Sequence, residues 1–540
     1  MKTNRLYTWI VALFVAIVFV PLTRAQNAVI GGEDTKVDYA NWLLGMKTKL
    51  CVADNGWMYI MSYTVDEAGN TVVKVFRSID DGVTFEKLKQ WKAPDKWVYP
   101  QVDIMVTGKN KSDIKLWVAE LANNAEENRG AMKIKTFDAD LMEATEILSK
   151  EFNGRLYAVS IASDYQSPSS HSEPFGVAIA LTGYDEGKNE SFLHYYYSLD
   201  GGKSFADKGI YHQSEEHGLG SVNLSLGSTS EGMNHDGWSL MGVVFEMNVG
   251  EIGFLTNFIN YDDAYKMTQP IKVNDEGDNT YDPKIQMMLN RESNNTVAGK
   301  ACHNFIITYT DWSEEEGLNI IYLYPKESFS YKKGDTHSSM DDLNRLAFAK
   351  SVENDHAASI KYDTRNNRYR FSWVHEKVKG EEWEILYRWA DYDKINDPNG
   401  WSESYICATS SHPLFCTSVE FNPVKEKACW AWVEEITDET IVGTLWMDAE
   451  WERLTATEEI IFHKVGMELY PNPAHDYTTI RLEKEGNYQA MLYDVEGKMV
   501  RSFAFEGNEY KLEVQDLPCG NYYLRTTSGN DSYTAQLLVE

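Results

Sequence analysis

Carboxylate side chains recur at one position of a repeated strand pattern in this sequence. When seven apolar runs are aligned, one column reads Ser62, Ala119, Thr182, Glu246, Thr310, Glu376 and Glu435. His375 stands beside Glu376, and Asp311 and Glu120 follow the column by one residue. Carboxylates that surround one pocket can carry out glycoside hydrolysis or bind cations. The column therefore makes Glu246, Glu376, Glu435, His375 and Asp311 candidate catalytic residues.

A structural interpretation of the same column competes with the catalytic one, and the sequence favours it. The chain holds 82 Asp and Glu against 51 Lys and Arg, so acidic residues are expected where strands run into turns. No G-x-S-x-G, P-loop or H-E-x-x-H motif occurs, and none of the six cysteines forms a C-x-x-C pair. We therefore predict no metal and no cofactor.

The elements that would position these residues form a repeat. Each unit is an apolar strand-like run, a polar turn and a second strand-like run. The units recur about every 60 residues, which in an all-β chain predicts a β-propeller of four-stranded blades. We expect seven blades within residues 26–455, with six blades as the alternative. The seven units begin at Trp57, Ile114, Phe175, Trp238, His303, Arg368 and Cys429.

Two stretches share a second pattern, Ser-x-Asp-x-Gly-x-(Thr/Ser)-Phe. The first comprises Ser78, Asp80, Gly82, Thr84 and Phe85, and the second comprises Ser198, Asp200, Gly202, Ser204 and Phe205. In such a stretch the aspartate can accept backbone hydrogen bonds, and the glycine can adopt positive φ. The phenylalanine that follows can pack between sheets. Each expected role is structural.

The two stretches resemble the Asp-box (BNR) repeat of sialidase-like propellers. The resemblance implies a fold in which these turns lie at the periphery, away from the active centre. It does not imply sialidase activity, because the Arg-Ile-Pro-like motif of sialidases is missing and the first arginine after the leader is Arg77.

The segment 466–540 changes to short alternating strands separated by glycine-containing turns, which predicts a small Ig-like β-sandwich after a linker at 456–465. It resembles the type A C-terminal sorting domain of the Bacteroidetes type IX secretion system. One departure is the final residue, Glu540, where the family often has a basic residue. The landmarks are Tyr470-Pro471-Asn472-Pro473, then Tyr493-Asp494-Val495-Glu496-Gly497-Lys498, then Leu517-Pro518-x-Gly520-x-Tyr522.

Residues 1–25 read as a secretory signal peptide, with Lys2 and Arg5 before an apolar run and Ala25 at the cleavage point. The alternative is that residues 1–25 stay uncleaved as a membrane anchor. If the signal peptide is cleaved, we expect no stable transmembrane segment in the mature protein. The sorting resemblance implies a second step through the secretion machinery and removal of the domain by a sortase. We therefore expect the protein in the extracellular space or on the outer-membrane surface.

A formal net charge of −31 provides no basic footprint for phosphate backbones, which excludes a nucleic-acid binder. The first functional hypothesis is a binding module for a glycan or protein ligand, and the second is a glycoside hydrolase that uses the carboxylate column. Aromatic side chains expected on loops could stack on a sugar or peptide, or fill space between blades. They are Tyr165, Tyr211, Trp312, Trp383 and Trp401.

Overall fold

The computed structural model describes the chain from residue 28 to residue 539, with gaps. The residues outside the description are 1–27, 30–33, 42–47, 67–69, 166–174, 215–217, 229–238, 248–249, 259–269, 276–278, 288–295, 298–299, 304, 314–316, 326–328, 333–342, 348–354, 396, 398, 436–441, 451–466, 495–497, 529–530 and 540. The predicted signal peptide, the predicted linker and Gly497 therefore lie outside the described residues. In the described part, no helix is long and apolar enough to cross a membrane. The chain divides into two compact units, Met1–Trp451 and Glu452–Glu540.

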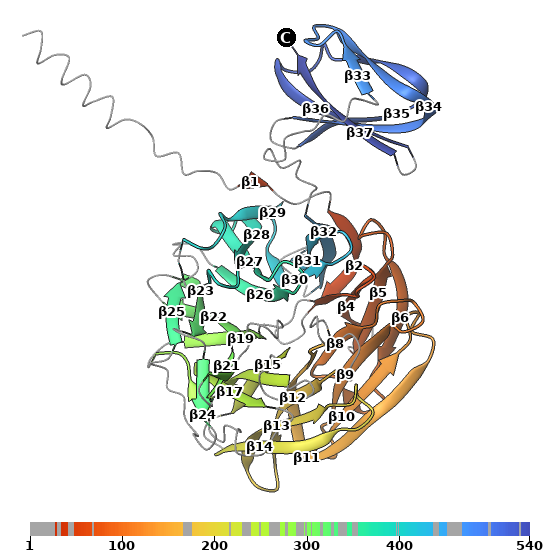
Figure 1. Cartoon of the computed structure of the whole chain (residues 1–540). Coiled ribbons are helices and arrows are strands. Elements are labelled where there is room, and N and C mark those ends of the chain that lie inside the picture. Colours follow the sequence, from red (N-terminus) through yellow and green to blue (C-terminus); the bar gives the residue numbers. More distant parts are fainter. Residues whose placement is uncertain are drawn as a thin grey trace, which may run out of the picture. The chain divides into compact units, whose positions relative to one another are not determined.

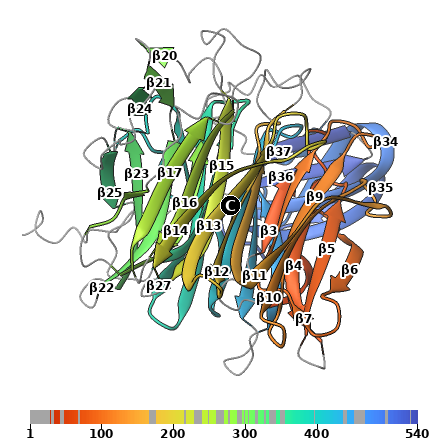
Figure 2. The same ribbon diagram turned by 90° about the horizontal axis from the view of Figure 1, so that it is seen from below.

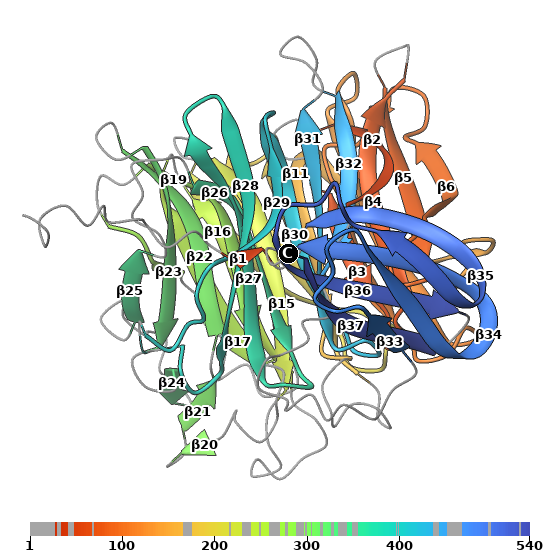
Figure 3. The same cartoon turned by 90° about the horizontal axis from the view of Figure 1, so that it is seen from above.

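The first unit is a β-propeller: its sheets follow one another in chain order around a common centre (Figure 1). Viewed from the side, the strands of neighbouring sheets run in similar directions (Figures 2 and 3). The first sheets contain β3 (Lys49–Val52), β4 (Met58–Val65), β5 (Thr71–Ser78) and β6 (Glu86–Lys92), then β8 (Val102–Thr107), β9 (Lys115–Asn124), β10 (Arg129–Phe137) and β11 (Ala144–Ser163), with β7 (Trp97–Val98) beside β9, and then β12 (Val177–Asp185), β13 (Glu190–Ser198) and β14 (Ala206–Ser214).

The later sheets repeat the same order, with sequence neighbours paired in antiparallel fashion. They contain β15 (Leu219–Ser228), β16 (Ser239–Met247), β17 (Ile252–Phe258) and β18 (Ile271–Lys272); β19 (Asn279–Met287), β22 (Phe305–Ser313), β23 (Gly317–Pro325) and β25 (Leu343–Ala347); β26 (Asp355–Asp363), β27 (Arg368–Val378), β28 (Glu382–Asp391) and β29 (Tyr405–Ser410); and β30 (Leu414–Asn422), β31 (Lys427–Glu435) and β32 (Val442–Ala449). A small extra sheet contains β20 (Thr296–Val297), β21 (Lys300–His303) and β24 (Phe329–Lys332).

The first strand of each sheet lies innermost, and these inner strands form a closed ring among the described residues. In order they are β3, β8, the second half of β11, β15, β19, β26 and β30; each contacts the next, and β30 contacts β3. The last sheet is completed from the other end of the unit, because β2 (Thr35–Asn41) pairs with β32. The short β1 (Ala28–Val29) adds to β29 in parallel. The propeller fold predicted from the repeat is confirmed. The number of blades remains a prediction, and the ring of seven inner strands agrees with seven.

Strand β11 belongs to two sheets and changes sheet at one glycine. Its residues 144–153 pair with β10 as an outer strand, and its residues 154–163 pair with β12 as an inner strand. At Gly154 the backbone has φ +135°, and a Cβ there would lie 1.9 Å from the carbonyl oxygen of Tyr184. Only glycine fits this crossing, because any side chain would overlap neighbouring backbone.

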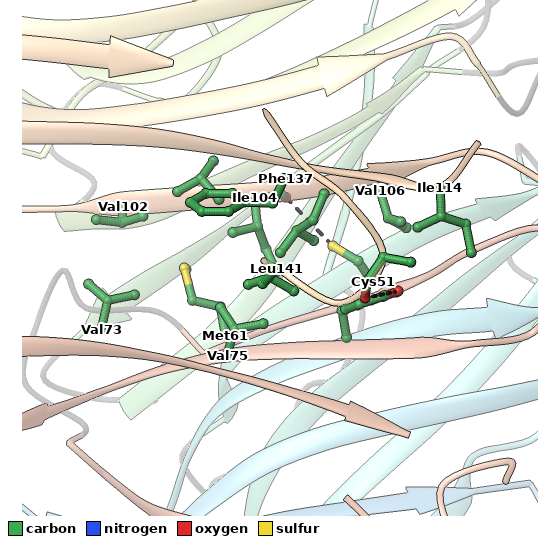
Figure 4. Close-up of a cluster of buried hydrophobic side chains, with 14 of the residues drawn as sticks. Cys51, Met61, Val73, Val75, Val102, Ile104, Val106, Ile114, Phe137 and Leu141 are labelled. Carbon is green, nitrogen blue, oxygen red and sulfur yellow. Dashed lines mark hydrogen bonds between the residues drawn. The ribbon is translucent and has the colours of Figure 1, made fainter. Parts of the chain in front are cut away.

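Apolar side chains fill the space between neighbouring sheets. Figure 4 shows the cluster between the first two sheets, where Val73 and Val75 of β5 face Ile104 and Val106 of β8. The thiol of Cys51 lies in the same cluster, 3.6 Å from the Ile104 carbonyl oxygen. Cys51 forms no disulfide. Burial excludes both faces of the middle strands from water, which explains why these strands read as continuous apolar runs.

Polar side chains accept hydrogen bonds from backbone N–H groups at the inner edge of the ring. The inner strands have no further strand beside them, so some of their backbone N–H groups bond to side chains of the preceding sheet. Leu50 N–H donates to Ser418 Oγ (3.0 Å) and Val419 N–H to Ser359 Oγ (3.0 Å). Ile161 N–H donates to Asp103 Oδ2 at 2.9 Å. These bonds link successive sheets around the centre.

The two Ser-x-Asp-x-Gly turns have the same internal geometry. In the second turn, Ser198 Oγ donates to Asp200 Oδ1 (2.7 Å), and Ser204 donates to Asp200 through its backbone N–H (2.9 Å) and its hydroxyl (2.6 Å). Gly202 has φ +83° and lies against Trp117 of the preceding sheet, while Phe205 packs on the core beside it. The first turn repeats these bonds around Asp80, and its Phe85 packs in the same way. All of these bonds are internal to the turn.

Asp200 gives the second turn a defined pH dependence. Burial acts to raise the pKa of Asp200, but hydrogen bonds from Ser204 and Ser198 outweigh it and hold the pKa at about 2. Because the folded pKa lies below the unfolded one, this carboxylate stabilises the fold above about pH 4, and the contribution is lost as the pH falls towards 2.

We expect Asp200→Asn to destabilise the propeller by about 1–3 kcal/mol near pH 7, the range for hydrogen bonds to a charged group. The difference in the free energy of unfolding between wild type and variant should narrow as the pH falls from about 4 towards 2. Urea unfolding of both proteins across this range measures it. A gap that stays constant down to pH 3 would contradict the role of the ionised carboxylate.

The second unit is a β-sandwich-like domain with its own core. Its strands are β33 (Met467–Tyr470), β34 (Tyr477–Asp494), β35 (Met499–Glu513), β36 (Gly520–Ser528) and β37 (Asp531–Val539). The long β34 pairs with β33, β35 and β36, and β36 pairs with β37. Leu492, Leu524 and Leu537 are fully buried at its centre.

Candidate functional site

The candidate carboxylates lie at one end of the propeller, which we call the entry face. It is the end where the inner strands begin and the second strands of the sheets finish. Five inner strands, β11, β15, β19, β26 and β30, carry a β-bulge near this end. A bulge leaves backbone groups unpaired and redirects side chains, and such bulges are common at rims and beside active sites. The sequence gives no sign of these bulges.

Glu246 connects two of the bulges. It stands near the end of β16, and its Oε2 accepts the N–H of Ser221 in the β15 bulge at 3.1 Å. Its Oε1 accepts the N–H of Asp282 in the β19 bulge at 3.0 Å. Asp282 itself has φ +55° and forms an ion pair with Lys284. Both oxygens of Glu246 are thus used to join neighbouring inner strands.

His375 is held by a buried aspartate that sequence reasoning missed. Asp355, the first residue of β26, is fully buried, and its Oδ1 lies 2.8 Å from Nδ1 of His375. The same oxygen accepts the indole N–H of Trp373 at 3.1 Å. An aspartate on Nδ1 fixes the orientation of an imidazole, as it does in hydrolytic triads. The only sequence signal was an Asp-His pair at 355–356.

His356 lies in the same region of the entry face. Burial lowers the pKa of His356, although the Leu414 carbonyl and the charges of Asp355, Glu376 and Asp282 act to raise it. We therefore expect a neutral ring at pH 7. Hydrogen bonds and electrostatic interactions link Glu246, Glu376 and His375 with Asp282, Asp355 and His356 in a cluster that spans three sheets.

Glu376 and the nominated residues outside this cluster make local contacts, some through side chains and some through the backbone. Glu376 at the end of β27 is buried, and its Oε1 accepts the N–H of Gly380 in the following turn at 2.7 Å. Glu435 ends β31, where its N–H donates to the Pro413 carbonyl at 2.9 Å. Asp311 on β22 lies 3.8 Å from Arg345. Glu120, one step past the column, accepts the indole N–H of Trp91 at 2.7 Å and pairs with Lys135 at 2.6 Å.

In the part of the chain that the structure describes, two aromatic side chains are exposed at the entry face. Trp312, near the end of β22, is 41% exposed, and Tyr157, in the β11 bulge, is 41% exposed. Trp383 and Trp401 are buried, which assigns them to the packing between sheets. Tyr211 packs against the core around Phe245, and Tyr165 stacks edge-on against Phe175 at 5.0 Å. The expectation that these aromatics lie on loops is wrong for Tyr211, Trp312 and Trp383, which lie in β14, β22 and β28 because their side chains pack along the sheets. Among the five expected aromatics, Trp312 is the one that is exposed at this end.

Metal-ligating side chains do not converge in the described residues. No group of three or more His, Cys, Asp or Glu is placed there to hold a metal ion. Cys51, Cys407, Cys429 and Cys519 are free thiols.

In the second unit, the Tyr470–Pro473 turn holds the last strand. Asn472 Oδ1 accepts the N–H of Leu538 at 2.8 Å, and the N–H of Ala474 donates to the Leu538 carbonyl at 2.8 Å. The second landmark closes on itself, because Asp494 accepts the N–H of Lys498 through its side chain (3.0 Å) and donates its own N–H to the Lys498 carbonyl (3.0 Å). In the third landmark, Tyr522 is buried and its hydroxyl donates to the Pro518 carbonyl at 2.7 Å.

Removing the Asn472 acceptor should loosen β37. We expect Asn472→Ala to speed hydrogen exchange at the Leu538 amide by about fivefold, since one hydrogen bond is worth about 1 kcal/mol. Asn472→Asp keeps the acceptor oxygen and is the matched control. Equal protection of Leu538 in all three proteins would show that Asn472 does not hold the strand.

Comparison with known proteins identifies the second unit. Residues 468–540 match the family described as the secretion system C-terminal sorting domain. The resemblance inferred from the three landmarks is thereby confirmed. No curated protein matches the chain.

Solved structures with a similar arrangement cover the propeller but are distant. The α-L-arabinofuranosidase Arb93A from Fusarium graminearum is 7% identical, covers 78% of this chain and 97% of its own, and has a TM-score of 0.40. An α-L-arabinanase from Penicillium chrysogenum is 7% identical over 78% of this chain and 98% of its own, at a TM-score of 0.38. The β-propeller domain of the trilobed protease from Pyrococcus furiosus is 9% identical over 78% and 99%, at 0.36. At such scores the fold assignment depends on the strand pairing described above.

Proposed function

We propose that this protein is exported through the type IX secretion system and binds a glycan or protein ligand at the entry face of its propeller. The observation that carries the proposal is the sorting domain at residues 468–540. A signal peptide at 1–25 would supply the first export step. The destination is then the cell surface or the medium, where a ligand would be a surface or environmental polymer.

We favour a binding function over hydrolysis because the carboxylates of the entry face accept hydrogen bonds from the backbone. Glu246 uses both oxygens on backbone N–H groups of two bulges, and Glu376 accepts the N–H of its own turn. A retaining or inverting glycosidase needs one carboxyl that gives a proton to the leaving group and one that acts as nucleophile or base. Carboxylates committed to the backbone are poor candidates for either role.

The exposed aromatic rings supply the positive argument for binding. Trp312 and Tyr157 offer large rigid surfaces at the entry face, and such side chains dominate the binding energy of many interfaces. Polar groups at the same end of the propeller, including His375, would fix the orientation of a ligand, as a few placed polar groups do in most binding sites.

A glycoside hydrolase is the second candidate, and the pair Asp355–His375 is the observation that favours it. An imidazole oriented by a buried carboxylate can serve as a general base. A screen of the full-length protein on aryl glycosides and oligosaccharides tests this candidate, with Glu376→Gln and His375→Gln as variants. Turnover by wild type that either substitution abolishes would replace the binding proposal with a catalytic one.

A further inference from the structure

The inner strands of the propeller carry two ion pairs that are not part of the entry-face cluster. Nζ of Lys361 on β26 lies 2.9 Å from Oε1 of Glu420 on β30. Nζ of Lys49 on β3 lies 2.6 Å from Oδ1 of Asp103 on β8. These strands are consecutive in the ring, because β26 contacts β30, β30 contacts β3 and β3 contacts β8. Each ion pair therefore bridges two neighbouring inner strands.

These charged side chains reach from one inner strand towards the free inner edge of the next. Ser359 and Ser418 accept backbone N–H groups at that edge. Side chains alternate along a strand, so Lys361 and Glu420, each two residues further on, lie on the same side as the serines. The side chains of Lys49 and Lys361 are 31% and 21% exposed, so solvent reaches both.

Electrostatic interactions join the two ion pairs. Burial acts to lower the pKa of Lys49, but Asp103, Cys51 and Glu420 together raise it above its ordinary value. Glu420 therefore acts on two ammonium groups, that of Lys361 through direct contact and that of Lys49 through its charge.

Asp54 extends this arrangement to the end of the ring opposite the entry face. It lies in the turn after β3, and burial raises the pKa of Asp54 to about 6, although Lys109 and Lys361 act to lower it. Carboxylates and ammonium groups thus alternate along the inner strands. We call this set the charge line, and its members in order are Asp103, Lys49, Glu420, Lys361 and Asp54.

Two carboxylate oxygens of the charge line have no hydrogen-bond partner among the described residues. Glu420 is 7% exposed, and its Oε2 is buried without a donor while its Oε1 accepts from Lys361. Oδ2 of Asp54 is also buried without a donor. A buried acceptor that lacks a donor is costly, and such a group in a native fold calls for a bound molecule or another explanation.

We propose that the charge line is a second binding site, separate from the entry face, for a small neutral molecule with several hydroxyl groups, such as glycerol or a monosaccharide. Hydroxyl groups both donate and accept hydrogen bonds. They can donate to Glu420 Oε2 and Asp54 Oδ2 and accept from the ammonium groups of Lys49 and Lys361.

The alternation of charge selects a neutral ligand over a charged one. The two ion pairs sum to no net charge, and each charge has an opposite charge beside it. A ligand charge attracted to one member of the line would be repelled by the next, and juxtaposed like charges are unfavourable. Water in place of the ligand is the competing outcome that the test must separate.

The test is a titration of the full-length protein with glycerol and with D-xylose, followed by saturation-transfer NMR. Wild type should bind at least one of the two. Lys361→Met combined with Glu420→Met removes one ion pair and keeps side chains of similar length, and it should weaken this binding by about tenfold or more. The matched control is Lys272→Met combined with Glu251→Met, which removes a 2.8 Å ion pair beside β17 and β18 and should bind as wild type does.

A third variant keeps the test decisive if the Lys361 and Glu420 double variant does not fold. Asp54→Ala removes one of the two unpaired oxygens from a turn, leaves both ion pairs in place and should weaken binding by about fivefold. Unchanged affinity in Asp54→Ala and in the double variant would overturn the proposal. Absence of polyol binding by wild type would also overturn it and assign the two oxygens to water.

Charged probes of similar size check the selection of a neutral ligand. Acetate and methylammonium, titrated in the same way, should show no binding that the Lys361 and Glu420 double variant removes. Binding of either ion that this variant abolishes, without binding of glycerol or D-xylose, would overturn the proposal of a neutral ligand.

Discussion

Replacing Gly154 with alanine is expected to destabilise the propeller by more than about 4 kcal/mol, or to prevent folding, because the new Cβ would overlap backbone atoms. A Cβ there lies 1.9 Å from the Tyr184 carbonyl oxygen, and φ is +135°. Backbone atoms on both sides belong to paired strands, so neither can move away without breaking the sheet. Urea unfolding followed by tryptophan fluorescence measures the loss.

Gly380 separates the steric effect from the effect of positive φ. It also has positive φ, at +73°, but nothing lies within 4 Å of a Cβ placed there. Gly380→Ala should therefore cost about 1–2 kcal/mol, the usual cost of a left-handed conformation for a residue with a side chain. Equal losses for the two variants would contradict the view that β11 passes between two sheets through a contact that admits only glycine.

Deleting residues 466–540 is expected to abolish export and leave the propeller in the periplasm. The sorting family match covers 468–540. The linker predicted at 456–465 precedes it. Subcellular fractionation with an antibody against the propeller provides the measurement. In the matched experiment, residues 456–540 joined to a periplasmic reporter should carry that reporter out of the cell. An exported truncated chain would show that the sorting information lies elsewhere.

The sequence predicted the middle of each sheet better than its edges. The two apolar runs of each unit are the second and third strands, such as β4 with β5 and β27 with β28, which are covered on both faces. Inner strands were not visible, because residues such as Ser359 and Ser418 interrupt the apolar pattern to satisfy the backbone of the next sheet. The pairing of β2 with β32 joins residues that are far apart in the chain, which no local pattern reveals.

The sequence predicted that these carboxylates share one end of the propeller, but not the hydrogen bonds that they form. The carboxylate column lies on second strands near the entry face. The role of Glu246, however, depends on bulges at Ser221 and Asp282, and residue types alone do not predict these bulges. The sequence did not predict a role for Asp355, because this residue begins an inner strand that has no apolar run around it. The sorting landmarks were recognisable because each consists of residues that close a local turn or hold one strand, as Asn472 does for β37.

The most direct test of the binding proposal is the affinity of two matched variants for whichever ligand a glycan and surface-protein array identifies with the full-length protein. We predict that Trp312→Ala weakens binding by about tenfold or more, as loss of an exposed aromatic anchor does. Val424→Ala, which removes an apolar side chain that is 54% exposed at the opposite end of the inner strands, should leave affinity unchanged. Equal affinity of both variants, or turnover of a glycoside that Glu376→Gln abolishes, would contradict an entry face that binds without catalysis.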